Sequence, residues 1–257
     1  METLVLDRAP NGVVTLTLNR PEKKNAMNMQ MFNELLQAFR EVDASTSDRV
    51  LVITGAGESF CSGADLSDRG SDTRHALQRL HWVADIALAL HRIPKPVIAK
   101  VNGVAVGAGM NLALGCDLVV ASEAARFSEI FARRGLSIDF GGSWLLPRLI
   151  GMHRAKELAL LADIISAKEA AEIGLVNRVL PASEVDAFVT DWADRLAAGP
   201  PLALSMTKRL LSNSFSATME EALEAEGLAQ TVNGGTEDTA EAIRAFLEKR
   251  EPRFKGR

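Results

Sequence analysis

The stretch VIAKVNGVAVGAGMN occupies residues 97–111 and joins a strand to a helix through a glycine-rich loop. Its first five residues form a short, mostly apolar run, which is typical of a buried strand. The loop that follows, 102–109, contains three glycines and leads into a short helical stretch at about 111–114. The order of strand, tight turn and helix start is therefore the local plan to look for elsewhere in the chain.

The same plan occurs earlier in the chain. The apolar run 50–54 precedes a second glycine-containing turn, Ser62-Gly63-Ala64-Asp65-Leu66. Backbone N–H groups at a helix start have no partner within the helix and carry the positive end of its dipole. Two such turns facing one pocket would hold one developing negative oxygen, as an oxyanion hole does. The alternative is that both turns are tight connections that need small residues.

Strands alternate with helices on both sides of these turns, which is typical of an α/β fold. Asn11-Gly12 predicts a hairpin turn, and Asn28 is the expected N-cap of a helix over 29–42. The spacing of Ser166 and Glu169 predicts a capping box at the start of another helix. The other expected elements are strands over 4–6, 14–18, 118–121 and 176–180 and helices over 76–93, 202–211, 219–229 and 239–247.

A domain boundary is expected at Gly199-Pro200-Pro201. No convincing strand follows Ser183, and the periodic stretches beyond the boundary are helical. We therefore expect an α/β core over 1–198 and a helical C-terminal lobe over 199–257.

Composition excludes several classes of protein. The 257 residues are 47% hydrophobic and 24% charged, which is average for a globular protein. The net charge of −4 gives no positive field that would attract nucleic acid. The apolar stretch 83–90 is too short to span a bilayer. Two cysteines and no leading apolar signal segment predict a cytoplasmic protein.

Metal, nucleotide and nucleophilic chemistry find little support in the sequence. The four histidines are scattered without an HExxH motif, so no metal site is expected. Gly107-Ala108-Gly109 lacks the third glycine of the dinucleotide fingerprint, and the P-loop and GxSxG motifs are absent. Cys61 and Ser62 have no nearby histidine in the sequence to activate them.

Five segments, in order and spread over nearly the whole chain, resemble those of the crotonase, or enoyl-CoA hydratase/isomerase, superfamily. The resemblance implies a spiral of repeated ββα units and a helical C-terminal lobe that forms trimers or dimers of trimers. It also implies an acyl-CoA substrate, with coenzyme A as part of the substrate and no permanently bound cofactor. The segments are NRPEKKNAM (19–27), GESFCSGADL (57–66), PKPVIA (94–99), NGVAVGAG (102–109) and FLEKREPRF (246–254).

The resemblance also implies roles for particular residues. The thioester oxygen of the acyl-CoA would be held by the backbone N–H groups of Ala64 and Ala108, which stabilise it as it becomes negative. Cations near the first hairpin and in the tail are candidates for coenzyme A, although each is alternatively a solvated surface charge. The expected substrate-binding residues are Lys23, Lys24, Asp65, Leu66, Gly109, Asn111, Phe131, Trp144 and Lys255.

The two glutamates that hydratases of this superfamily use are missing. Their positions fall on Asn111 and Phe131, and neither side chain exchanges protons. Ordinary two-glutamate hydration is therefore disfavoured. Glu129, two residues from the second position, is a reserve candidate.

Asp139 is the expected acid/base. It lies in SIDFGGSWLLPR (137–148), which resembles the branch containing the ring-opening isomerases of phenylacetate breakdown and the dienoyl-CoA isomerases. Moving a double bond requires only one base, and an apolar pocket lined by residues such as Phe131, Phe140 or Trp144 would raise the pKa of that base. The alternative is that Asp139 is a helix N-cap with a lowered pKa.

The sequence therefore predicts an enoyl-CoA isomerase that works through a thioester enolate. One rival is a hydratase with the same oxyanion hole and a different proton relay. Another is a non-catalytic member that binds acyl-CoA or RNA, because a fold alone does not fix a function.

Overall fold

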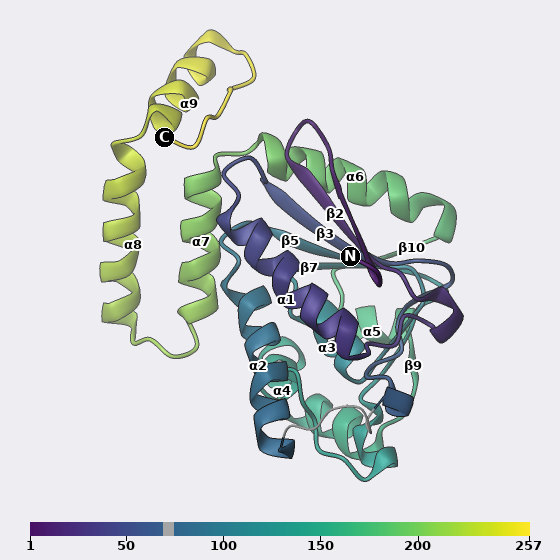
Figure 1. Ribbon diagram of the computed structural model, residues 1–257. Helices are drawn as coiled ribbons and strands as arrows, with labels where there is room; N and C mark the ends of the chain where they lie inside the picture. The colour runs from purple at the N-terminus through teal and green to yellow at the C-terminus, as the bar shows by residue number, and fades with distance from the viewer. Residues whose placement is uncertain (69–74) are drawn as a thin grey trace.

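The computed structural model describes residues 1–68 and 75–257 and confirms the α/β class (Figure 1). Its larger sheet has the strand order β1-β2-β3-β5-β7-β10, and every pair of neighbours except the antiparallel β1 and β2 is parallel. The strands are β1 Leu4–Arg8, β2 Val13–Leu18, β3 Val50–Gly55, β5 Val97–Val101, β7 Leu118–Ser122 and β10 Arg178–Leu180.

A second sheet of very short strands, in the order β4-β6-β8-β9, lies beside the first. None of these strands was predicted: β6 falls within the loop expected over 102–109, and strands of two or three residues are too short to show a periodicity. The pairs β4·β6 and β6·β8 are parallel and β8·β9 is antiparallel. The strands are β4 Ser59–Cys61, β6 Val104–Val106, β8 Arg126–Ser128 and β9 Ile165–Ser166.

The chain repeats one strand of each sheet followed by a helix. The pair β3 and β4 leads to α2 (Ala76–Arg92), and β5 and β6 lead to α3 (Ala108–Leu114). The pair β7 and β8 leads through a 3-10 turn to α4 (Gly142–Leu161). Each repeat brings the end of a short strand and the start of a helix to the same side of the molecule.

Both faces of the larger sheet are buried, as is usual for parallel strands. Leu51 and Ile53 of β3 belong to the main core with α1 (Met29–Ala44), whereas the alternate residues Val50 and Val52 contact α6 (Ala182–Ala198). The remaining elements are α5 (Ala167–Glu172) and the 3-10 turns η1 (Pro21–Lys23), η2 (Leu66–Asp68) and η3 (Ile130–Arg134).

Several local predictions are confirmed. The Asn28 side chain accepts the N–H of Met31 at 2.9 Å and caps α1, and Ser166 and Glu169 form the expected capping box. Two expectations differ in extent: the third helix begins at Ala108 rather than near residue 111, and the strand expected over 176–180 begins at Arg178. The helices α4 and α6 were not predicted.

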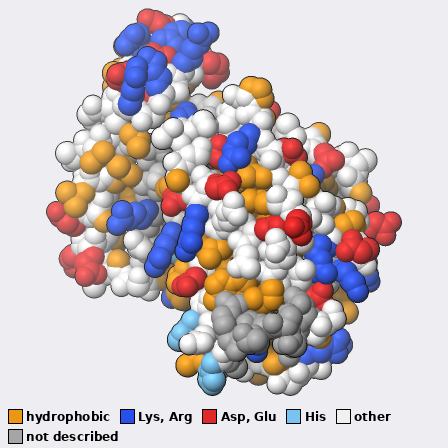
Figure 2. Space-filling model, viewed as in Figure 1, with side chains coloured by type: hydrophobic (Ala, Val, Ile, Leu, Met, Phe, Trp, Pro, Cys, Tyr) orange, Lys and Arg blue, Asp and Glu red, His pale blue; other side chains and the backbone are white. Residues whose placement is uncertain are grey.

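Three C-terminal helices stand apart from the sheets (Figure 1). They are α7 (Pro201–Asn213), α8 (Met219–Gly234) and α9 (Glu237–Glu248). Hydrophobic side chains are exposed over this part of the surface, and Lys and Arg side chains gather around the tail (Figure 2). Within the described part of the chain, every helix is too short or too polar to cross a membrane.

Candidate active site

The two glycine-containing turns lie next to each other because β4 and β6 are parallel neighbours. In their register Cys61 is opposite Ala105, so Ala64 and Ala108 each follow three residues later. A Cβ atom built on Gly63 would lie 2.9 Å from the carbonyl oxygen of Val106 and 3.8 Å from the amide nitrogen of Ala108. The two turns are therefore in contact, and the close approach requires glycine at position 63, where φ is +96°.

The N–H groups of Ala64 and Ala108 are not used by secondary structure. The bridge between Met27 and Ala64 is made by the N–H groups of Met27 and Asp65, at 2.8 Å each. Ala108 is the first residue of α3, so its N–H has no acceptor within the helix. Among the described residues, neither N–H has a hydrogen-bond acceptor.

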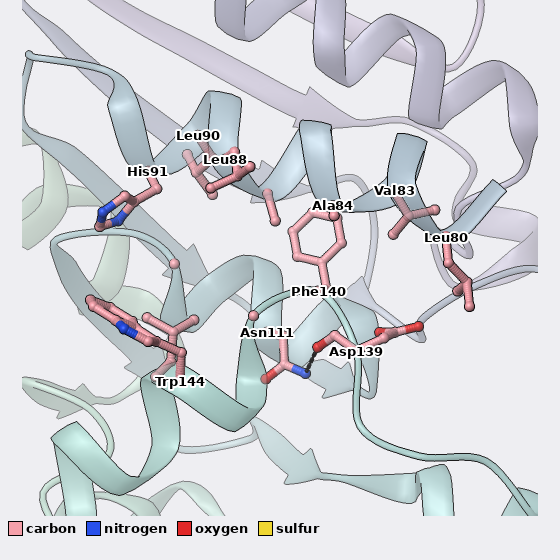
Figure 3. A pocket seen from close by; sticks show the side chains of 14 residues that line it. Leu80, Val83, Ala84, Leu88, Leu90, His91, Asn111, Asp139, Phe140 and Trp144 are labelled. Carbon is pink, nitrogen blue, oxygen red and sulfur yellow. Dashed lines mark hydrogen bonds between the residues drawn. The ribbon is translucent and has the colours of Figure 1, made fainter. Parts of the chain in front are cut away.

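An apolar cavity of about 600 Å³ lies between α2 and the start of α4 (Figure 3). Its polar lining residues are Asn111 and Asp139 at one side and His91 at the far end, where the His91 and Trp144 rings meet edge to face at 5.4 Å. The wall contributed by α2 was not predicted, because helical periodicity does not distinguish residues that line a cavity from residues of the core. This wall consists of Leu80, Val83, Ala84, Ala87, Leu88, Leu90 and His91.

A smaller cavity of about 110 Å³ lies against Ala64 and Asp65. It shares Leu80, Val83 and Asp139 with the larger cavity. Asp139 therefore stands between the turn at Ala64 and the apolar cavity.

Asp139 does not cap α4. The N-cap of that helix is Gly141, with no side-chain cap, so the alternative interpretation of Asp139 as an N-cap is wrong. Its backbone carbonyl accepts the side-chain Nδ2–H of Asn111 at 3.0 Å. Figure 3 shows this bond and the Asp139 carboxylate directed away from Asn111, toward the Leu80 end of the cavity.

Glu129 is a second carboxyl group near this point, and its side chain is fully buried. Burial raises its pKa to about 8; a weak hydrogen bond from Asn111 at 3.4 Å opposes the rise, and the nearby Asp139 adds to it. Glu129 lines neither cavity.

Four of the other predicted binding residues lie at or beside the first turn. Lys24 lies beside the first turn, where its carbonyl accepts the N–H of Ser62 at 3.0 Å, and Lys23 is next to it. Asp65 is paired with Arg20 at 3.0 Å, and hydrogen bonds from Ser67 and Arg20 lower its pKa although burial opposes this. Leu66 is exposed in η2.

The remaining three predicted residues also line neither cavity. Phe131, expected in the pocket wall, packs instead against the turn: a Cβ on Gly107 would lie 3.5 Å from its ring. Gly109 is buried against Cys61. Lys255 pairs with Glu237 in the tail at 3.6 Å, and Figure 1 shows that the tail lies far from α2 and α4 of the same chain.

Two other kinds of chemistry have no geometric support. Burial raises the pKa of the Cys61 thiol to about 12, so it is not an activated nucleophile. Within residues 1–68 and 75–257, no three His, Cys, Asp or Glu side chains are grouped as metal ligands.

The chain is similar over nearly its whole length to proteins of known family and structure. A protein-family model described as enoyl-CoA hydratase/isomerase matches residues 8–257. The chain is 38% identical to the 1,2-epoxyphenylacetyl-CoA isomerase of Escherichia coli and 37% identical to its 2,3-dehydroadipyl-CoA hydratase, over the full length of all three proteins. An enoyl-CoA hydratase structure from Bacillus anthracis superposes with a TM-score of 0.95 at 33% identity, over 99% of this chain and 100% of the other.

Proposed function

Because the chain belongs to the enoyl-CoA hydratase/isomerase family of the crotonase superfamily, and is thus an enzyme of acyl-CoA chemistry, we propose that it moves a carbon–carbon double bond within an acyl-CoA thioester. The thioester oxygen is held by the N–H groups of Ala64 and Ala108, and Asp139 moves the proton. Removing a proton beside a thioester carbonyl puts negative charge on the oxygen, and two fixed donors stabilise that charge.

The position of Asp139 carries the proposal. Of the described residues that line the larger cavity, it is the one with a carboxyl group, and it also borders the cavity at Ala64. A thioester held at Ala64 and Ala108 would direct its acyl chain past Asp139 into the apolar cavity. One carboxylate is sufficient for isomerisation, because it takes a proton from one carbon and returns it to another.

Asn111 distinguishes this site from that of a two-glutamate hydratase. It stands at the position of the first hydratase glutamate, and its amide cannot exchange protons. Its side-chain amide donates to the Asp139 backbone carbonyl and, more weakly, to Glu129, so its role is to hold substrate or the Asp139 segment in place.

Coenzyme A is anionic, so its binding requires local cations in a chain of net charge −4. Lys23 and Lys24 are exposed beside the first turn and are candidates within the same chain. Lys255 is too far from the cavity of its own chain. We propose that residues 199–257 form a lobe through which the protein self-associates as a homotrimer or dimer of trimers, and that Lys255 serves a neighbouring subunit.

Hydration is the second candidate function. The relative named 2,3-dehydroadipyl-CoA hydratase is 37% identical to this chain, against 38% for the isomerase. In this alternative Asp139 or Glu129 would activate water at the same oxyanion hole.

A substrate series distinguishes the candidates. The purified protein is incubated with 2-enoyl-, 3-enoyl- and dienoyl-CoA thioesters in deuterated water, and products are followed by mass spectrometry and proton NMR. Isomerisation gives a product of unchanged composition, apart from deuterium that exchanges through the base. A hydroxyacyl product without isomerisation rejects the proposal, and binding without turnover favours a non-catalytic acyl-CoA-binding protein.

A further inference from the structure

Glu129 lies behind the proposed active site, in the short link between β8 and η3. Its side chain is fully buried and contacts neither cavity. Its Oε2 atom lies 3.4 Å from Nδ2 of Asn111. A buried carboxyl beside a residue of the cavity wall suggests a role that acts through that residue.

Two oxygen atoms of this pair have no hydrogen-bond partner among the residues that the structure describes. They are Oε1 of Glu129 and Oδ1 of Asn111, and both are buried. The oxygens of an ionised carboxylate and of an amide only accept hydrogen bonds, so they cannot form a hydrogen bond with each other. A carboxyl that keeps its proton resolves the problem: its O–H donates to Oδ1 of Asn111 while its other oxygen accepts one Nδ2–H.

The second Nδ2–H of Asn111 reaches the next part of the site. It donates to the backbone carbonyl of Asp139 at 3.0 Å. The amide is also confined by the start of α4, since a Cβ on Gly142 would lie 2.5 Å from both Nδ2 and Oδ1 of Asn111. The orientation of this amide therefore sets the position of the Asp139 segment.

We propose that Glu129 is a positioning residue: it retains its proton, pairs with the Asn111 amide through two hydrogen bonds, and so holds the Asp139 backbone in place for proton transfer. The role in proton transfer rests on the proposed function. The acid–amide pair itself is a property of the fold.

The surroundings of Glu129 favour the protonated form. Burial disfavours the charge, and the negative charge of nearby Asp139, in the segment before α4, disfavours a second one. Among the described residues, no cation contributes to the pKa shift of Glu129. The carboxyl is thus close to neutral at pH 7.

Two substitutions at position 129 separate a positioning role from other roles. Glu129→Gln supplies an amide that makes the same two bonds to Asn111 without a titrating group, so kcat is expected to stay within about threefold of the wild type. Glu129→Leu keeps a similar volume but removes both bonds, so kcat is expected to fall about 10- to 100-fold while KM changes less than threefold, because a small displacement of a reacting group has effects of this size. Glu123→Gln, at an exposed glutamate, is the matched control.

Three outcomes would overturn the proposal. A loss of kcat in Glu129→Gln as large as that in Asp139→Asn would mean that Glu129 itself transfers protons. Unchanged kcat in Glu129→Leu would mean that the side chain only fills space. If Glu129→Leu does not fold, Asn111→Ala tests the same pair from the other side and is expected to lower kcat similarly; unchanged kcat there would also refute the role.

Infrared spectroscopy tests the acid–amide pair without activity. The difference spectrum between the wild type and Glu129→Gln at pH 7 should contain the carbonyl band of a protonated carboxylic acid, and its absence would refute the pair. A wild-type protein that turns over no enoyl-CoA would instead refute the proposed function, and the positioning role with it, while the band still reports on the protonation of Glu129.

Discussion

Cys61 of β4 lies directly opposite Ala105 of β6, and this single rung aligns the two turns that follow. Three residues beyond each member of this pair, past the end of its strand, the chain reaches an alanine whose N–H is not used by secondary structure. Parallel pairing therefore brings two backbone donors from separate parts of the chain to the same place. Side chains contribute little to this arrangement, so a test has to change the backbone.

Ala108→Pro removes one of the proposed donors. Proline is tolerated at the first position of a helix, where the N–H has no intrahelical acceptor, so the melting temperature is expected to change little. The rate constant kcat with an enoyl-CoA substrate is expected to fall about 10²- to 10³-fold, as for the loss of one oxyanion-hole donor. Ala108→Gly keeps the N–H and is the matched control. Equal kcat in the proline and glycine variants would exclude Ala108 from the oxyanion hole.

Asp139→Asn tests the proposed acid/base. The amide occupies the same space but cannot exchange protons, so kcat is expected to fall about 10²- to 10⁴-fold. The dissociation constant of coenzyme A, measured by calorimetry, should remain within about twofold. Asp163→Asn, at an exposed aspartate, is the control. Activity retained in Asp139→Asn would assign the proton transfer to another group.

Short-range signals predicted the elements that depend on neighbouring residues. The Asn28 cap, the Ser166 capping box and the strand over 97–101 were found because each rests on a local pattern of residue types. Helix α4 was missed because Pro147 and Gly151 interrupt its sequence pattern, and Gly151 does have a non-helical conformation. The second sheet was missed because its strands are stabilised by pairing between distant segments.

The candidate site likewise has features that the sequence predicts locally and features that depend on contacts between distant segments. The turns at Ala64 and Ala108 could be singled out from their glycines and from the resemblance to a known family. The bond between Asn111 and Asp139 and the fit of Asn111 against Gly142 depend on how α3 meets α4, which no local pattern encodes. The burial of Glu129 was equally hidden, since glutamate is almost always exposed.

Glu34 should make the stability of the protein depend on pH in the acid range. It is buried on α1 and accepts the N–H groups of Glu2 and Thr3 at 2.7 and 2.9 Å, which ties the N-terminal segment to the helix. Burial opposes ionisation, but hydrogen bonds from Glu2, Gln30 and Thr3 dominate and lower its pKa to about 2. Because the folded state holds the proton less tightly than the unfolded state, this stabilisation is present above about pH 4.5 and is lost as the pH falls toward 2.

Glu34→Gln is expected to lower the free energy of unfolding by about 2 kcal/mol at pH 7, the size of a loss of hydrogen bonds to a charged group. It should also flatten the dependence of stability on pH between about 2 and 4.5. Urea denaturation at several pH values measures both effects, with Glu41→Gln on the same helix as the control. If the free energy of unfolding of Glu34→Gln changes with pH as steeply as that of the wild type over this range, Glu34 is not the responsible group.

Self-association should depend on the exposed apolar face of α8. Leu228 and Val232 lie one helical turn apart, with exposed fractions of 62% and 51%, and Phe246 of α9 is 82% exposed. Apolar surface of this kind marks an interaction site rather than part of the chain's own core. Leu228→Glu places a charge on this face and is expected to shift the protein from trimers or hexamers to monomers in light scattering, with an unchanged circular dichroism spectrum. Gln230→Glu adds the same charge at an exposed polar position of α8 and should remain associated.

Lys255→Ala, made in the wild-type and in the Leu228→Glu backgrounds, tests whether the tail serves a neighbouring subunit. In the associated protein, Lys255→Ala is expected to raise KM for the acyl-CoA severalfold, because a cation that contacts the anionic carrier is lost. In the Leu228→Glu background the same change should have no further effect, since no neighbour is present to receive the tail. A monomeric wild-type protein, or an equal effect of Lys255→Ala in both backgrounds, would contradict this arrangement.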